Sequence, residues 1–213
     1  AVSTGAKLQV LGCDFYCTVE GEAWHWHWRD GAVFDLPHPG LGGRMQVTNA
    51  AGVLAAVQAL QPLLPVAETA IRAALPKLAL AGRLQRDGNT ILDVAHNAEA
   101  AAVLADNLRA AVSGPVWLVL GMLSDKPIAA VCAALAPQVR QVFCGTLPGP
   151  RGLDGETLAG HARAAGMQAE ACADVVSAYA RARQQAGREE TIVVCGSFLT
   201  VAAIAEYLEK SGG

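Results

Sequence analysis

From residue 79 onward, short apolar runs alternate with alanine-rich stretches that are long enough to form helices. Such runs predict strands, and alanine is the residue that most favours a helix. The predicted strands are 90–94, 116–120, 141–144, 168–172 and 191–195, and the predicted helices are 98–111, 128–136, 154–165, 175–186 and 198–210. This alternation predicts an α/β fold in which helices flank both faces of a mostly parallel sheet.

The first 78 residues follow a different pattern. Residues 24–28 alternate strictly between Trp and His, which in a strand places three Trp on one face and two His on the other. We expect strands at 7–12 and 15–19, a hairpin turn at 29–31, a loop at 36–43, and helices at 49–60 and 66–75. The change of pattern predicts two domains, residues 1–78 and 79–213.

Composition excludes several classes of function. The 213 residues carry a net charge of −3, so the basic surface that nucleic acid requires is not expected. No run of about 18 apolar residues occurs, and we therefore expect no membrane partner. The start of the chain lacks the pattern of a signal peptide. Most of the six cysteines lie in apolar runs, where free Cys behaves as a small hydrophobe, so we expect a reducing, cytoplasmic compartment.

Polar residues follow three of the predicted strands. They are Asp93, His96 and Asn97 after the first strand, the turn 121–127 after the second, and Gly196 and Ser197 after the last. Parallel sheets bind ligands beyond the carboxyl ends of their strands, so these ends are candidates for a site. Each also has a structural interpretation, since Asp93 can cap a loop and Ser197 and Asn97 are natural helix N-caps.

Five segments resemble the signatures of folylpolyglutamate and dihydrofolate synthases, which belong to the Mur ligase superfamily. They occur in that family's order and are 80–85, 91–97, 121–126, 149–152 and 194–198. Residues 46–51 are similar to the Asn-Ala-Ala helix start of the family's preceding domain. One departure is Ala81, where the family usually has Pro before the Gly-Arg pair; this loses a fixed φ angle but no contact group.

The resemblance implies a Rossmann-like glutamate-binding domain at 79–213. It also implies that residues 1–78 are the β-hairpin-plus-helix tail of an N-terminal ATP-binding domain. In the family's reaction, ATP phosphorylates a dihydropteroate or folate carboxylate, and the amine of L-glutamate then attacks the acyl phosphate. The implied cofactors are ATP and Mg²⁺, whose charge stabilises the transferring phosphoryl group.

The resemblance also assigns roles to single residues. Asn49 and Arg83 would contact the nucleotide, and Asp93 would hydrogen-bond its ribose or order the site. His96 and Ser197 match the positions that bind and orient the incoming glutamate. Lys126 and Arg151 are further candidates for contacts with an anion. No metal ligand is expected in this chain, because the family's Mg²⁺ ligands lie upstream.

The family's phosphate-binding loop is not found in the sequence. No Gly-x-x-x-x-Gly-Lys-Ser/Thr pattern occurs, and the glycine-rich segment 40–44 is interpreted as a flexible loop. We therefore expect that this chain alone is inactive and that its partner is the missing N-terminal domain of the same polypeptide.

Three alternatives stay open. One is a Mur-type UDP-N-acetylmuramoyl amino-acid ligase, which the compact segment 93–97 disfavours. Another is a non-catalytic Rossmann-like binding module, which the lack of a phosphate-binding loop favours. A zinc site at Cys13, Cys17, His25 and His27 is disfavoured, because its spacing is not that of a zinc finger.

Overall fold

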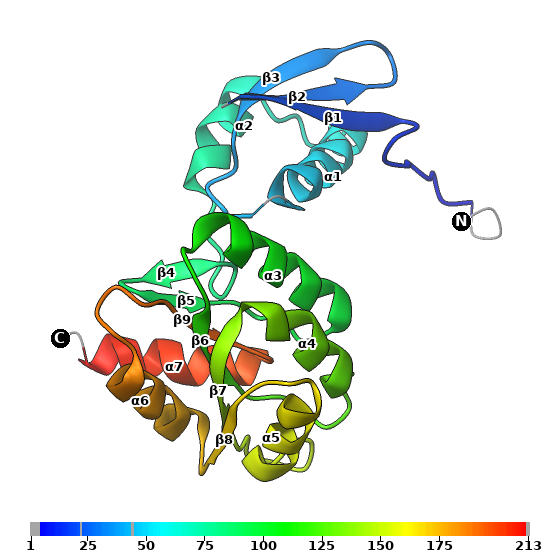
Figure 1. Cartoon of the computed structure of the whole chain (residues 1–213). Helices are drawn as coiled ribbons and strands as arrows, with labels where there is room; N and C mark the ends of the chain where they lie inside the picture. Colours follow the sequence, from blue (N-terminus) through cyan, green and yellow to red (C-terminus); the bar gives the residue numbers. More distant parts are fainter. Residues whose placement is uncertain (1–4, 22, 44, 212–213) are drawn as a thin grey trace. The chain divides into compact units, whose positions relative to one another are not determined.

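A computed structural model of the chain describes residues 5–21, 23–43 and 45–211. The chain divides into two compact units, one ending at Leu80 and the other beginning at Ala81. Figure 1 shows the helices and strands of both units, which are described separately below.

A six-stranded sheet forms the centre of the second unit, in the order β4-β5-β9-β6-β7-β8. Every neighbouring pair from β5 to β8 is parallel, and β4 pairs antiparallel with β5 at one edge. The last strand of the chain, β9, thus lies between β5 and β6. The strands are β4 (Gln85–Asp87), β5 (Thr90–Leu92), β6 (Val116–Leu120), β7 (Val139–Gly145), β8 (Ala169–Cys172) and β9 (Ile192–Cys195).

Helices cover both faces of this sheet, as the sequence predicts (Figure 1). One face packs against α3 (Ala98–Ala111), α4 (Ile128–Leu135) and α5 (Gly155–Ala164). The other packs against α6 (Val175–Gln185) and α7 (Phe198–Ser211). A 3-10 turn, η3 (Ala136–Gln138), follows α4. The predicted mostly parallel α/β fold is confirmed.

The central strands are apolar at every position because both of their faces are covered. In β6, Leu118 and Leu120 belong to the cluster beneath α3, α4 and α5. Trp117 and Val119 belong to the cluster beneath α6 and α7. All five residues of β6 are buried. Burial on both faces is typical of parallel sheets and explains why this segment is a continuous apolar run.

The first unit is a three-stranded antiparallel sheet with helices packed on one face. The sheet contains β1 (Phe15–Glu20), β2 (Ala23–Trp28) and β3 (Val33–Pro37) in that order. The helical segments are α1 (Met45–Leu60), α2 (Glu68–Ala74) and η2 (Leu75–Lys77). The alternation in β2 is confirmed: Trp24, Trp26 and Trp28 are buried in one core cluster with α1, whereas His25 and His27 point to the other face.

Four predictions for local structure are wrong. Residues 7–12 form no strand, because the chain turns at Gly12 and makes only an isolated bridge between Leu11 and Phe15. The loop expected at 36–43 starts later, since β3 extends to Pro37. The helix expected from Asn49 begins at Met45, and the next one is shortened to Glu68–Ala74. Gly40 to Gly43 do lie in a loop, and Arg44 lies outside the described residues.

Neither a metal site nor a membrane-spanning helix is found in the described part of the chain. No group of three or more His, Cys, Asp or Glu residues there could hold a metal ion. The helices of that part are also too short or too polar for any of them to span a bilayer.

Candidate functional site

Backbone hydrogen bonds join three loops at the carboxyl edge of the parallel strands. The Asp93 N–H donates to the Val194 carbonyl at 3.0 Å, and the Gly196 N–H donates to the Ala95 carbonyl at 2.9 Å. The Gly121 N–H donates to the Cys195 carbonyl at 3.3 Å. The three polar strand ends that the sequence singled out therefore lie side by side on β5, β9 and β6.

Asp93 holds two loop segments with one carboxylate. Its Oδ1 accepts the N–H of Ala95 at 2.9 Å, and its Oδ2 accepts the N–H of Leu84 at 3.0 Å. The side chain is buried, and this burial raises the pKa of Asp93, while the two N–H donors and the charge of Arg83 act in the opposite direction. Asp93 thus holds the turn before β4, at Leu84, against the loop after β5, at Ala95.

Arg83 lies in a tight turn that leads into the sheet. Gly82 has a φ of 69° and Leu84 a φ of 46°, and the Val94 N–H donates to the Gly82 carbonyl at 2.9 Å. A Cβ on Gly82 would lie 2.7 Å from Val94 Cγ1, so only glycine fits. Within the described residues the Arg83 guanidinium makes no hydrogen bond, and it is exposed. A planar guanidinium in this position can bind a phosphate through two parallel bonds.

His96 presents a nitrogen lone pair at the same edge. Its Nδ1 lies 2.8 Å from the Val94 carbonyl oxygen, and because a carbonyl only accepts, Nδ1 carries the hydrogen. In the neutral ring Nε2 is then an acceptor. The ring is half-buried and its centroid lies 6.1 Å from that of Phe198, the first residue of α7.

Ser197 and Asn97 cap the two helices that begin at this edge. Ser197 Oγ accepts the N–H of Thr200 at 3.0 Å and also lies 2.8 Å from Thr200 Oγ1. Asn97 Oδ1 accepts the N–H of Ala100 at 2.8 Å, as predicted for the N-cap of α3. Ser197 is only 4% exposed and acts as the helix N-cap that the sequence indicates.

The loops after β6 and β7 are joined to each other. The Ser124 N–H donates to the Arg151 carbonyl at 2.8 Å, and the Arg151 guanidinium pairs with Asp125 at 3.1 Å. Lys126 approaches the same carboxylate at 3.5 Å. Both candidate anion contacts, Lys126 and Arg151, therefore share the charge of Asp125.

Asn49 belongs to the first unit. It lies in the second turn of α1, and its Nδ2 donates to Gln46 Oε1 at 3.2 Å. The prediction that Asn49 starts the helix is wrong, because α1 begins four residues earlier, at Met45.

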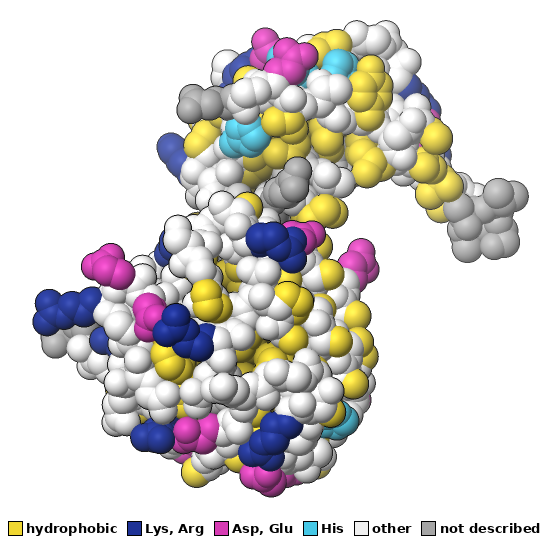
Figure 2. Space-filling model, viewed as in Figure 1, with side chains coloured by type: hydrophobic (Ala, Val, Ile, Leu, Met, Phe, Trp, Pro, Cys, Tyr) yellow, Lys and Arg dark blue, Asp and Glu magenta, His cyan; other side chains and the backbone are white. Residues whose placement is uncertain are grey.

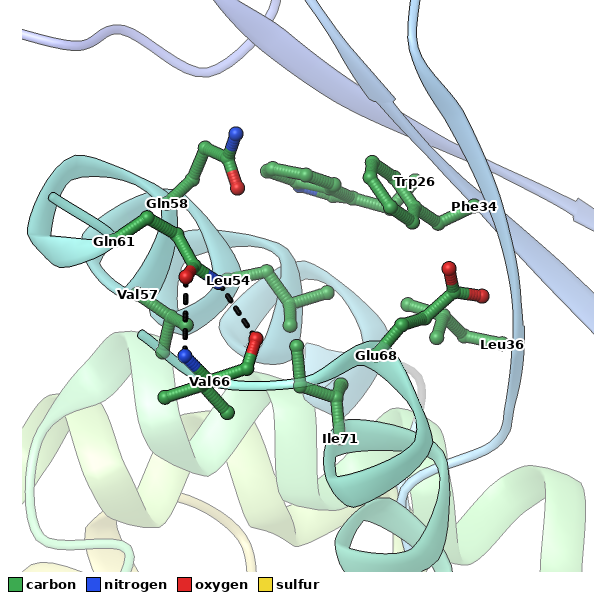
Figure 3. Close-up of a pocket in the computed structure, with 10 residues that line it drawn as sticks. All are labelled: Trp26, Phe34, Leu36, Leu54, Val57, Gln58, Gln61, Val66, Glu68 and Ile71. Carbon is green, nitrogen blue, oxygen red and sulfur yellow. Dashed lines mark hydrogen bonds between the residues drawn. The ribbon is translucent and has the colours of Figure 1, made fainter. Parts of the chain in front are cut away.

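A cavity of about 240 Å³ lies in the first unit between β2, β3, α1 and α2 (Figure 3). Trp26 and Phe34 form one wall. The Gln61 side chain exchanges two hydrogen bonds with the Val66 backbone, and Glu68 pairs with Arg72. Because these rim groups satisfy one another, the cavity offers little polar chemistry to select a ligand.

Thr200 is the site residue that sequence reasoning missed. It is fully buried, and its hydroxyl donates to the Gly121 carbonyl at 2.7 Å. Its signal in the sequence is its spacing, because the N–H three residues after an N-cap is the one that the cap binds.

The chain is similar to known proteins over all or nearly all of its length. Residues 80–198 match the family described as "Mur ligase, glutamate ligase domain". The dihydrofolate synthase/folylpolyglutamate synthase of Escherichia coli (strain K12) is 36% identical over 219 residues, which cover 100% of this chain and 50% of the relative. The chain thus spans about half the length of the curated relatives it matches.

Solved structures give the same result. E. coli FolC in complex with DHPP and ADP has a TM-score of 0.87 and 35% identity, over 98% of this chain and 49% of that one. A bifunctional folylpolyglutamate synthase/dihydrofolate synthase with Mn, AMPPNP and L-glutamate bound has a TM-score of 0.85 and 34% identity, again over 98% and 49%.

Proposed function

The chain belongs to the Mur ligase family, and from this premise we propose that it is part of an ATP-dependent ligase that adds L-glutamate to dihydropteroate, to folates or to both. The observation that carries the proposal is the joined carboxyl edge, where Asp93, His96 and Ser197 follow neighbouring strands. This edge lies within the part of the chain that matches the glutamate ligase domain.

The proposed reaction has two steps. The γ-phosphoryl group of ATP is transferred to a carboxylate oxygen of the folate-type acceptor, which gives ADP and an acyl phosphate. The ammonium group of L-glutamate loses one proton, and the free amine attacks the acyl carbon. The C–N bond forms, the C–O bond to the phosphate breaks, and the nitrogen loses a second proton to give the amide as phosphate leaves.

Each residue of the edge has a role in these steps. Arg83, whose guanidinium is exposed, would bind a nucleotide phosphate. Asp93 would order that arginine, since it binds the backbone of the adjacent Leu84. His96 Nε2 and Ser197 Oγ would bind the incoming glutamate and aim its amine at the acyl carbon. Asn49, in the first unit, would contact the nucleotide.

The cofactors of the proposed reaction are ATP and Mg²⁺. When bound, Mg²⁺ would neutralise the developing charge on the phosphoryl group. The described residues contain no carboxylate or histidine cluster that fits a metal ion. We propose that the protein ligands of Mg²⁺ lie in the N-terminal domain, as the family resemblance implies.

The nucleotide-binding half would be the missing N-terminal domain of the same polypeptide, and three observations support this. The sequence contains no phosphate-binding loop, and the chain spans about half of its relatives. The first unit also has apolar surface to offer a partner domain: Val53, Leu63 and Leu64 are all more than half exposed. Figure 2 shows hydrophobic side chains reaching the surface of this unit.

Helix α1 supports the same proposal. It has no charged residue in 16 positions, and its apolar residues point in all directions. A helix that is hydrophobic all round is normally buried on all sides. We therefore propose that the exposed side of α1 packs against the nucleotide-binding half and that the 213-residue chain alone does not turn over.

Six free cysteines support a cytoplasmic location.

The test is an assay of the product of the complete reading frame that contains this chain. We expect ADP release that requires both L-glutamate and dihydropteroate or tetrahydrofolate, and none from the 213-residue chain assayed in parallel. A UDP-N-acetylmuramoyl acceptor serves as the second substrate arm. Turnover with that acceptor and none with pteroates would replace the proposal by the Mur-type peptidoglycan ligase, and no ATP use at all would favour the binding module.

A further inference from the structure

A buried chain of hydrogen bonds connects Ser197, Thr200 and Gly121 at the carboxyl edge. The Thr200 hydroxyl donates to the Gly121 carbonyl at 2.7 Å, and the Ser197 hydroxyl lies 2.8 Å from Thr200 Oγ1. Thr200 is fully buried and Ser197 is 4% exposed. These hydrogen bonds link the start of α7 to the end of β6, which lie far apart in the sequence.

The direction of these bonds follows from the number of hydrogens. The Gly121 carbonyl can only accept, so the single hydroxyl hydrogen of Thr200 is used there. The 2.8 Å contact between the two hydroxyls is therefore made by the hydrogen of Ser197. Ser197 Oγ also accepts the Thr200 N–H at 3.0 Å. Its hydrogen and one lone pair are thus engaged, and one lone pair remains.

We propose that Thr200 is a positioning residue for amino-acid binding, because it fixes Ser197 as a hydrogen-bond acceptor. A hydroxyl in this state can receive an N–H donor, but it has no hydrogen for a carboxylate. The group that Ser197 takes is therefore the amine of the incoming amino acid rather than either of its carboxylates. This inference rests on the proposed function and adds the polarity of its amino-acid site.

His96 has the same polarity. Its Nδ1 hydrogen is held by the Val94 carbonyl, so its outward nitrogen is an acceptor in the neutral ring. Two acceptors at one edge suit an ammonium group, which has only donors to offer. Donors for the carboxylates of the amino acid can come from the first N–H groups of α7, which have no intrahelical partner.

The variant Thr200→Val tests the inference in the product of the complete reading frame. Valine keeps the shape of threonine but removes the acceptor that holds the Ser197 hydrogen. We expect the KM for L-glutamate to rise about tenfold, the effect of one hydrogen bond to a charged group, with kcat and the KM for ATP changed less than about twofold. Thr200→Ser restores the hydroxyl and should return the KM to near the wild-type value.

Thr90→Val is the matched control. Thr90 is equally buried and its hydroxyl also bonds to another hydroxyl, that of Tyr179, at 2.8 Å. It begins β5 and so lies at the opposite end of the strand from Asp93. We expect this variant to lower the melting temperature as Thr200→Val does, but to leave the KM for glutamate unchanged.

Glutarate, which has both carboxylates and no amine, separates the two groups of the substrate. Its inhibition constant should be the same in wild type and in Thr200→Val, since the affected bond goes to the amine. Equal weakening of glutarate and glutamate, an unchanged KM for glutamate, or no rescue by serine would each overturn the inference while leaving the proposed function intact. A wild-type enzyme that does not consume ATP with glutamate would instead end both.

Discussion

A methyl group on Gly196 would lie 2.5 Å from the carbonyl oxygen of Gly121. Gly196 has a φ of 109°, a backbone conformation that other residues rarely adopt. The close approach of these two glycines brings the loops after β9 and β6 into contact. It also lets the Gly196 N–H reach the Ala95 carbonyl.

Gly196→Ala should therefore damage the edge through both strain and collision. We expect the free energy of unfolding to fall by about 3 kcal/mol in urea titrations. Gly160→Ala is the control: it lies within α5, and a Cβ there would have no neighbour within 4 Å. That variant should be more stable by up to about 1 kcal/mol, because alanine favours a helix. Equal effects of the two substitutions would contradict the close approach.

Asp93→Ala removes an acceptor from two backbone N–H groups. We expect the free energy of unfolding to fall by about 2 kcal/mol at pH 5. Burial raises the pKa of Asp93, so the native state holds its proton more tightly than the unfolded state does. The associated stabilisation is complete below the usual aspartate range, near pH 4, and is lost as pH rises through the folded pKa.

The difference in stability between wild type and Asp93→Ala should therefore shrink as the pH is raised from about 4, the usual aspartate value, through the folded pKa. Asp87→Ala, on the exposed edge strand β4, provides the baseline and should change little at any pH. A difference that grows with pH would show that the carboxylate, rather than the acid, is the favoured form.

Asp174 should have the opposite pH dependence. It caps α6 by accepting the Ser177 N–H at 2.6 Å, and this bond lowers the pKa of Asp174. Its contribution is present above the unfolded pKa and is lost as pH falls through the folded value. Asp174→Asn keeps a good cap without a charge, so wild type should lose stability relative to this variant between pH 5 and 3, as measured by thermal melts.

The cysteines should differ widely in reactivity. Burial raises the pKa of Cys132 to about 11 and that of Cys144 to about 12, whereas Cys13 is exposed. Because the thiolate is the reactive form, iodoacetamide at pH 8 should label Cys13 in the native protein and leave Cys132 and Cys144 unlabelled. Peptide mapping by mass spectrometry measures this, with denatured protein as the fully labelled control. Equal labelling rates in the native protein would contradict the burial of these thiols.

Substitutions at Arg83 and His96 should affect the use of ATP and of glutamate separately. In the complete enzyme, Arg83→Ala should raise the KM for ATP or lower kcat by at least about tenfold through loss of the proposed phosphate contact. His96→Ala should mainly raise the KM for glutamate. Arg86→Ala, on β4, removes an exposed arginine from the same segment and should change neither. Unchanged kinetics in the first two variants would reject both assignments.

The sequence predicts the second unit well because its elements depend on strong local patterns. The bounds of α3 and β6 agree with the prediction at both ends. Strand β4 was not predicted, since its three residues are polar and exposed and it forms only by pairing with β5. In the first unit, the prediction of a strand at 7–12 is wrong, because this segment pairs with no strand among the described residues.

The candidate site was predictable in position but not in detail. Topology alone brings the ends of β5, β6 and β9 to one edge, so the neighbourhood of Asp93 and Ser197 follows from the strand pattern. The bond from Thr200 to Gly121 spans 79 positions and depends on the tertiary fold. No periodicity or motif in the sequence encodes such a contact.

The position of β9 has a consequence for synthesis of the protein. Because β9 inserts between β5 and β6, residues 192–195 must have left the ribosome before those two strands acquire their shared neighbour. A nascent chain that stops before Ile192 would leave Leu92 and Leu120 on separate, open strand edges. The carboxyl edge that carries Asp93 and Ser197 is therefore completed only after β9 has been synthesised.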